Sequence, residues 1–95
     1  MKFFEGWAPP VVWGPWIEFA GLAGGPSTYK IDLETLSSAP STFEAELVYF
    51  KDGGERTDIV IGPTSHTFTA GSCVCVSKIR FRSYSMGQII RMTVK

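Results

Sequence analysis

The chain has 95 residues, of which 44% are hydrophobic, 14% aromatic and 19% charged. This length is typical of one domain with a thin hydrophobic core, and we expect residues 1–95 to form a single domain. Lysine plus arginine equals aspartate plus glutamate, so the formal net charge is zero. Nucleic acids and anionic membranes are bound through an excess of cationic side chains, so neither is expected as a partner.

Residues 1–10 predict an aromatic, proline-bearing N-terminal arm that contains Phe4 and Trp7. Glu5 and two prolines interrupt any hydrophobic region of a signal peptide. No stretch reaches the roughly 20 apolar residues of a transmembrane helix. The expected location is therefore the cytoplasm, or outside the cell after export without a cleaved signal peptide.

The first predicted strand covers residues 11–20 and carries Trp13 and Trp16. Pro15 cannot donate a hydrogen bond to a neighbouring strand, so the segment predicts an edge strand or a bulge at Gly14. The two tryptophans are three residues apart, and ideal alternation would place them on opposite faces.

The next two segments predict strands of different clarity. Residues 28–36 alternate cleanly between apolar and polar side chains. Residues 42–50 alternate less cleanly, and Ser41 with Glu44 resembles the capping box of a helix. A helix is therefore an alternative for 42–50, although the aromatic and β-branched content favours a strand.

Four further segments predict strands and are separated by turn signals: residues 58–61, which are short and apolar, 65–69, which are rich in threonine, and 73–84 and 88–95, which alternate. Turn residues recur about every 8–12 positions, which is typical of sandwiches and barrels. The sequence therefore predicts an all-β fold, a single antiparallel β-sandwich of about seven short strands.

The cysteine and histidine content offers little for a metal or a cofactor. Cys73 and Cys75 are two residues apart in a predicted strand, so a disulfide between them would need a strained backbone. We interpret them as reduced, buried thiols. His66 is the only histidine, so a metal site lacks ligands, and no metal or cofactor is expected.

No arrangement of residues predicts catalysis. Ser65 adjoins His66, but neighbours in a strand point to opposite faces, and no acid lies close by in sequence to orient the imidazole. Glu44 and Glu46 share a face, as paired carboxylates of a hydrolase would, but cross-strand ion pairing explains them better. We therefore expect no enzyme activity and no catalytic residues.

Lys78, Arg80 and Arg82 share the polar face of the predicted strand 73–84. If this strand lies beside 42–50, the three cations form cross-strand pairs with carboxylates. The alternative is an anion-binding contact made by the same three side chains.

The aromatic side chains near the N-terminus are the main candidates for an interface or a ligand platform: Phe4, Trp7, Trp13 and Trp16. The leading hypothesis is a non-catalytic module for protein interaction or self-assembly, a homo-oligomer with Lys2–Trp16 in the contact. One alternative is a small carbohydrate-binding module in which an exposed Trp or Tyr stacks on a glycan. Another is a proteinaceous enzyme inhibitor.

Overall fold

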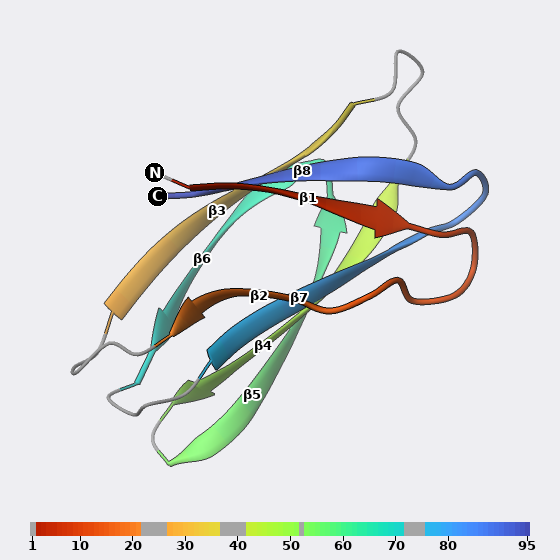
Figure 1. Ribbon diagram of the computed structural model, residues 1–95. Coiled ribbons are helices and arrows are strands. Elements are labelled where there is room, and N and C mark those ends of the chain that lie inside the picture. The colour runs from red at the N-terminus through yellow and green to blue at the C-terminus, as the bar shows by residue number, and fades with distance from the viewer. Residues whose placement is uncertain (1, 22–26, 37–41, 52, 72–75) are drawn as a thin grey trace.

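The computed structural model describes residues 2–21, 27–36, 42–51, 53–71 and 76–95, and its regular structure is entirely β-strand. Eight strands follow one another along the chain (Figure 1): β1 (Lys2–Ala8), β2 (Ile17–Gly21), β3 (Ser27–Thr35), β4 (Phe43–Lys51), β5 (Gly54–Gly62), β6 (Thr64–Ala70), β7 (Val76–Ser83) and β8 (Gln88–Val94). Cys73 and Cys75 lie outside the described residues.

The strands form two four-stranded antiparallel sheets packed face to face (Figure 1). The first sheet has the order β1-β8-β3-β6 and the second β2-β7-β4-β5. Every connection except the one between β4 and β5 passes from one sheet to the other. This strand order is that of an eight-stranded jelly roll, a double-sheet form of the β-sandwich. The predicted β-sandwich is confirmed, with eight strands in place of about seven.

The N-terminal region differs from the sequence prediction. Residues 2–8, expected as an arm, form β1, which pairs with β8 along its whole length. The inward positions of β1 include Gly6 and Ala8, which are small, so its alternation is hidden in the sequence. A Cβ atom at Gly6 would lie 2.6 Å from the Cδ1 atom of Ile17. The small residue is therefore what lets β1 pack against the second sheet.

The strand expected over 11–20 is also shorter than predicted. Only Ile17–Gly21 is strand β2, and residues 9–16 cross from the first sheet to the second. Pro15 interrupts strand pairing, as expected from its missing N–H. Val11 has a φ of 68°, a left-handed conformation that does not continue a strand.

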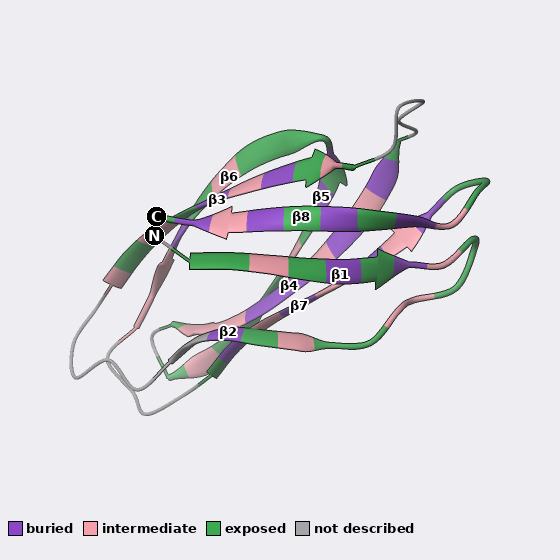
Figure 2. Ribbon diagram, turned by 45° about the horizontal axis from the view of Figure 1, so that its top comes forward, coloured by how far each residue is buried: buried purple, intermediate pink, exposed green. Residues whose placement is uncertain are grey.

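Residues 43–50 belong to strand β4, so the helical alternative for 42–50 is wrong. Phe43, Ala45 and Leu47 have no exposed surface, and the glutamates between them point outward. This period of two belongs to a strand that buries one face. Figure 2 shows the same alternation of buried and exposed residues along β1 and β8.

The core is built from the inner faces of both sheets. The largest fully buried side chains are Ile31, Leu33, Phe43, Leu47, Ile79, Phe81, Ile90 and Met92. Phe43 and Phe81 meet edge to face with ring centroids 6.1 Å apart, a favoured aromatic geometry. At the other end of the core, Phe68 contacts the rings of Phe19, Tyr29 and Tyr49.

Ser83, at the end of β7, is fully buried and makes four hydrogen bonds. Its N–H donates to the Pro9 carbonyl (2.9 Å), and its carbonyl accepts from the Val11 N–H (2.8 Å). Its hydroxyl donates to the Ala8 carbonyl (3.0 Å) and accepts from Gln88 Nε2 (3.4 Å). One residue thus joins the end of β1, the crossing segment, β7 and the start of β8.

We expect Ser83→Ala to lower the free energy of unfolding by about 1–2 kcal/mol, because the buried Ala8 carbonyl loses its donor. Urea unfolding followed by tryptophan fluorescence measures the change. Ser85→Ala is the matched control, since Ser85 is exposed in the following turn, and it should stay within about 0.5 kcal/mol of wild type. Equal effects of the two substitutions would contradict the role given to Ser83.

Candidate functional site

Residues 9–16 carry two of the predicted tryptophans onto the outer face of the second sheet. The segment is tied to the end of β7 by the hydrogen bonds of Ser83 and by the Gly14 N–H, which donates to the Phe81 carbonyl (2.9 Å). Because residues 9–16 are not a strand, ideal alternation does not apply to Trp13 and Trp16. The expectation that they face opposite sides is wrong: both contact Arg80.

The two tryptophan rings interleave with the three cations of β7. Trp16 lies between Lys78 Nζ (4.6 Å to the ring centroid) and the Arg80 guanidinium (4.3 Å). Trp13 lies between the guanidinium groups of Arg80 (5.0 Å) and Arg82 (4.4 Å). Cations within about 6 Å of a ring centroid are attracted to the ring face. We name this array of five side chains the tryptophan–cation ladder.

Carboxylates of β4 pair with the two arginines of the ladder. Arg80 Nε donates to Glu46 (2.6 Å), and Arg82 Nε donates to Glu44 (2.9 Å). Each pair is directly opposed in the register of β4 and β7, so the cross-strand ion pairs expected from the sequence are present for two of the three cations. Lys78 lies opposite Val48 in β4 and Glu18 in β2. An external anion at either arginine would have to displace a carboxylate.

Tyr84 extends this network toward the β7–β8 turn. Burial raises the pKa of its hydroxyl, and the charge of Glu44 and a hydrogen bond to that carboxylate raise the pKa further. The predicted anion contact and two of the predicted platform residues therefore form one array whose polar groups bind one another. Their proposed binding roles stay predictions.

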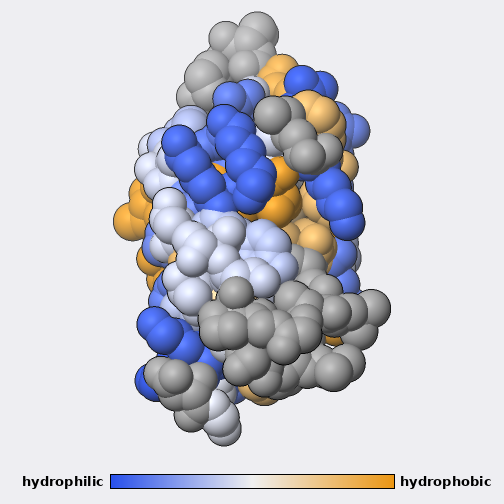
Figure 3. All heavy atoms as spheres, turned by 90° about the vertical axis from the view of Figure 1, so that its left-hand side faces the viewer, coloured by the Kyte–Doolittle hydropathy of each residue, from blue (hydrophilic) through white to orange (hydrophobic). Residues whose placement is uncertain are grey.

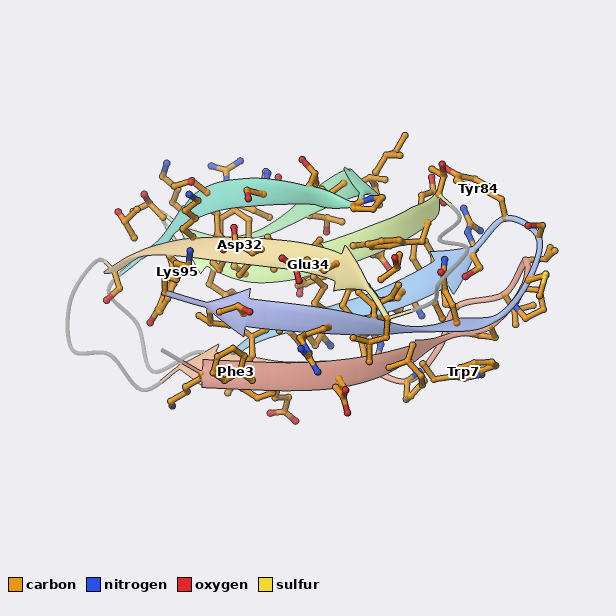
Figure 4. All side chains as sticks on the ribbon, turned by 90° about the horizontal axis from the view of Figure 1, so that it is seen from above. Phe3, Trp7, Asp32, Glu34, Tyr84 and Lys95 are labelled. Atoms are coloured by element: carbon orange, nitrogen blue, oxygen red, sulfur yellow. The ribbon has the colours of Figure 1, made fainter. Side chains whose placement is uncertain are left out.

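Phe4 and Trp7, the other predicted platform residues, face opposite ways from β1. Phe4 is half-buried and contacts Phe19 edge to face at 6.4 Å, which closes the edge between β1 and β2. Trp7 is 46% exposed on the outer face of the first sheet. Its ring lies over Gly87, where a Cβ atom would be 2.4 Å from the Trp7 Cη2 atom. Figure 4 shows Trp7 and Tyr84 at the same end of the molecule.

This end of the sandwich holds the connections β1–β2, β3–β4, β5–β6 and β7–β8, as the register of the strands requires. We call it the loop end and define it by its described connecting residues, 9–16, 36, 42, 63 and 84–87. Its exposed large hydrophobic side chains outside the tryptophan–cation ladder, which contains Trp16, together with two from the adjoining strands, are Trp7, Val11, Val12, Leu36, Tyr84, Met86 and Ile89. Figure 2 shows the β1–β2 and β7–β8 connections of this end as largely exposed.

The apolar side chains of the loop end are neighbours. Trp7 is directly opposite Ile89 in the β1–β8 register, and the Leu36 N–H donates to the Ile89 carbonyl (3.4 Å). Trp7 covers Gly87, which follows Met86 in the turn. The sequence prediction named Trp7 and, through the segment Lys2–Trp16, covered Val11 and Val12; it missed Leu36, Tyr84, Met86 and Ile89. Tyr84 and Met86 occupy turn positions where polar residues are usual. This departure from ordinary turn composition is the feature of the sequence that could have indicated an exposed apolar surface here.

The loop end carries no charge among its described connecting residues. The nearest charged residues lie inside the adjoining strands: Glu34 of β3, Glu44 of β4 and Arg82 of β7. At the opposite end, where both termini lie, Lys2, Lys51, Glu55 and Lys95 are exposed at the ends of the strands and of the chain. Figure 3 faces that end and shows hydrophilic side chains on it. Protein interfaces are depleted of charge in their centres and enriched in aromatic residues and methionine, so the loop end has the composition of an interface.

The edge between β5 and β6 holds a second polar cluster. His66 Nε2 lies 3.0 Å from Asp58 Oδ2, so an acid eight residues earlier does meet the imidazole. Tyr49 also bonds to Asp58; burial first, and then this carboxylate, raises the tyrosine pKa. Ser65 donates instead to Asp32 on the outer face, so Ser65 and His66 do not come together.

No protein-family model, curated protein or solved structure matches this chain. Within the described residues no helix could span a bilayer, and no three His, Cys, Asp or Glu side chains group as a metal site would require. Jelly rolls occur in lectins, cupins and viral capsid domains. The fold alone therefore does not indicate the function, which has to be inferred from the residues on the surface.

We expect Arg80 and Trp16 to be energetically coupled. In a double-mutant cycle with Arg80→Met and Trp16→Leu, the coupling free energy should be about 0.5–2 kcal/mol in favour of the native pair. Urea unfolding of the four proteins measures it. Arg91→Met is the control, because Arg91 makes a longer, exposed contact with Glu5 (3.8 Å), and it should change stability by less than about 1 kcal/mol. A coupling of zero would contradict the ladder.

Asp32 makes stability depend on pH at the acid end. Hydrogen bonds from Lys95 and Ser65, and then the charges of Lys95 and Lys30, hold the pKa of this carboxyl below its ordinary value of 3.8. A lowered folded-state pKa stabilises the fold above the unfolded pKa, and this contribution disappears as the pH falls through the folded-state value. Asp32→Asn should therefore flatten the fall of Tm below pH 4, measured by calorimetry, and identical profiles would contradict the assignment.

Proposed function

We propose that the chain is a non-catalytic jelly-roll module that makes protein contacts, above all with itself, through the loop end. One observation carries this proposal: among the described residues, seven of the twelve exposed large hydrophobic side chains, not counting Trp16 of the ladder, gather at this end, whose connecting residues carry no charge. Large exposed apolar patches mark interaction sites.

The size of the patch supports the proposal. Its exposed side chains offer about 500 Å² of apolar surface, taking roughly 60–250 Å² for each whole side chain. This is about a tenth of the accessible surface of 5234 Å². Two such patches would bury about 1,000 Å² together, which is the lower limit for a specific protein interface.

The carbohydrate-binding alternative has less support. A stacking platform needs a free ring face beside groups that bind hydroxyls, but the faces of Trp13 and Trp16 contact cations. Trp7 is exposed, and its neighbours in the patch are Ile89, Leu36 and the β7–β8 turn. An enzyme inhibitor would present the same turn to a cleft, which is again a protein contact.

Light scattering at micromolar concentration tests the proposal. We expect a mass of at least twice the 10.5 kDa of one chain, and tryptophan fluorescence that does not change when polysaccharides are added. A mass of 10.5 kDa would contradict self-assembly. A monomer mass together with a change of tryptophan fluorescence on adding a polysaccharide would favour the carbohydrate-binding alternative.

A further inference from the structure

We infer that the occupant of the loop end is a second copy of this chain, docked loop end to loop end about a two-fold axis with Met86 near the axis. This inference rests on the proposed function and adds to it the two-fold symmetry of the contact and the residue near the axis.

The charge pattern favours a copy over a different partner. In a two-fold contact the same patch meets itself, so any charge near the axis would face its own copy. The described connections of the loop end contain no charged residue, and the formal net charge of the chain is zero. These connecting residues carry no charge with which to select a complementary partner and none that would repel its own copy. The adjoining Glu44 and Arg82 are paired with each other.

The surface is held in place by contacts within the chain. The Val11 N–H bonds to Ser83, and the Trp7 ring lies against Gly87, so the β1–β2 and β7–β8 connections support one another. A preorganised surface loses less conformational entropy on binding. Met86 is 75% exposed and Val11 69% exposed. The most exposed side chains of the patch therefore lie on backbone that contacts within the chain hold in place.

Val11 is the strained point of this surface. Its φ of 68° is unfavourable for a β-branched residue, and the Val12 N–H donates to the Pro10 carbonyl (2.8 Å) across it. Glycine would adopt this turn without strain. Strained residues cluster at binding sites, and an exposed valine at this position adds apolar area to the contact.

Two of the four edge strands, β1 and β5, are less suitable for joining copies, and the uncharged edge strand β6 is tested below by Thr67→Lys. A two-fold pairing of β1 along its full length would place Glu5 opposite its own copy, since Glu5 is the middle residue of the strand. The same pairing of β5 would place Asp58 opposite Asp58. Like charges directly opposed across strands are destabilising.

The test introduces single charges at exposed positions and measures the dimer dissociation constant by light scattering and sedimentation. Met86→Lys should raise the Kd at least tenfold, because it places two ammonium groups near the axis. Ile59→Lys and Thr67→Lys are the matched controls: both residues are exposed, on the outer faces of β5 and β6. They should leave the Kd within about threefold of wild type.

A charge-swapped mixture tests the symmetry. Met86→Glu alone should also dissociate, whereas an equimolar mixture of Met86→Lys and Met86→Glu should form heterodimers that restore at least half of the dimer. All variants should keep the wild-type circular dichroism spectrum, because Met86 is exposed in a turn. A mixture that stays monomeric would overturn the two-fold contact at this residue.

The outcomes separate the inference from the proposed function. Wild-type oligomers that persist in both Met86 variants would overturn the inference and leave self-assembly standing. Dissociation by Ile59→Lys or Thr67→Lys instead would place the contact on a sheet face. A wild-type mass of 10.5 kDa at micromolar concentration would overturn both.

Discussion

The buried hydrogen bonds of Ser83 are the constraint on which the rest of the structure depends. A crossing from one sheet to the other breaks strand pairing and leaves backbone polar groups that need partners. Ser83 supplies them through its N–H, carbonyl and hydroxyl, at the point where β1 ends and β7 ends. The position of residues 9–16 follows from these bonds, and with it the position of Trp13 and Trp16.

The tryptophan–cation ladder is the consequence on the outer face of the second sheet. Once residues 9–16 lie along β7, both rings meet the cations that alternate outward from that strand. Glu44 and Glu46 neutralise the arginines from the other side. Residues that resemble a binding platform in the sequence thus hold a connection in place. The apolar surface left for a partner is at the loop end.

The jelly-roll topology explains why an apolar end can form at all. Successive strands run in opposite directions, so alternate connections lie at the same end, and the pairing of β1 with β8 brings the first and the last of these connections together. The β1–β2 and β7–β8 connections are about 70 residues apart in sequence, and Trp7 with Gly87 joins them in space. A patch assembled in this way is invisible to any local pattern, since each connection contributes only a few apolar residues.

The sequence by itself determined the strands that bury one face and expose the other. Alternation identified β3, β4, β7 and β8 and their inward residues, because a half-buried strand must repeat with a period of two. It also indicated the pairing of the β4 carboxylates with the β7 arginines. It failed at β1, where Phe4 is the one large apolar residue of the inner face and the next two inward positions are Gly6 and Ala8. Only the tertiary structure decided the sheet order, the orientation of Trp13 and Trp16 and the composition of the loop end, because each depends on contacts between segments that local periodicity does not relate.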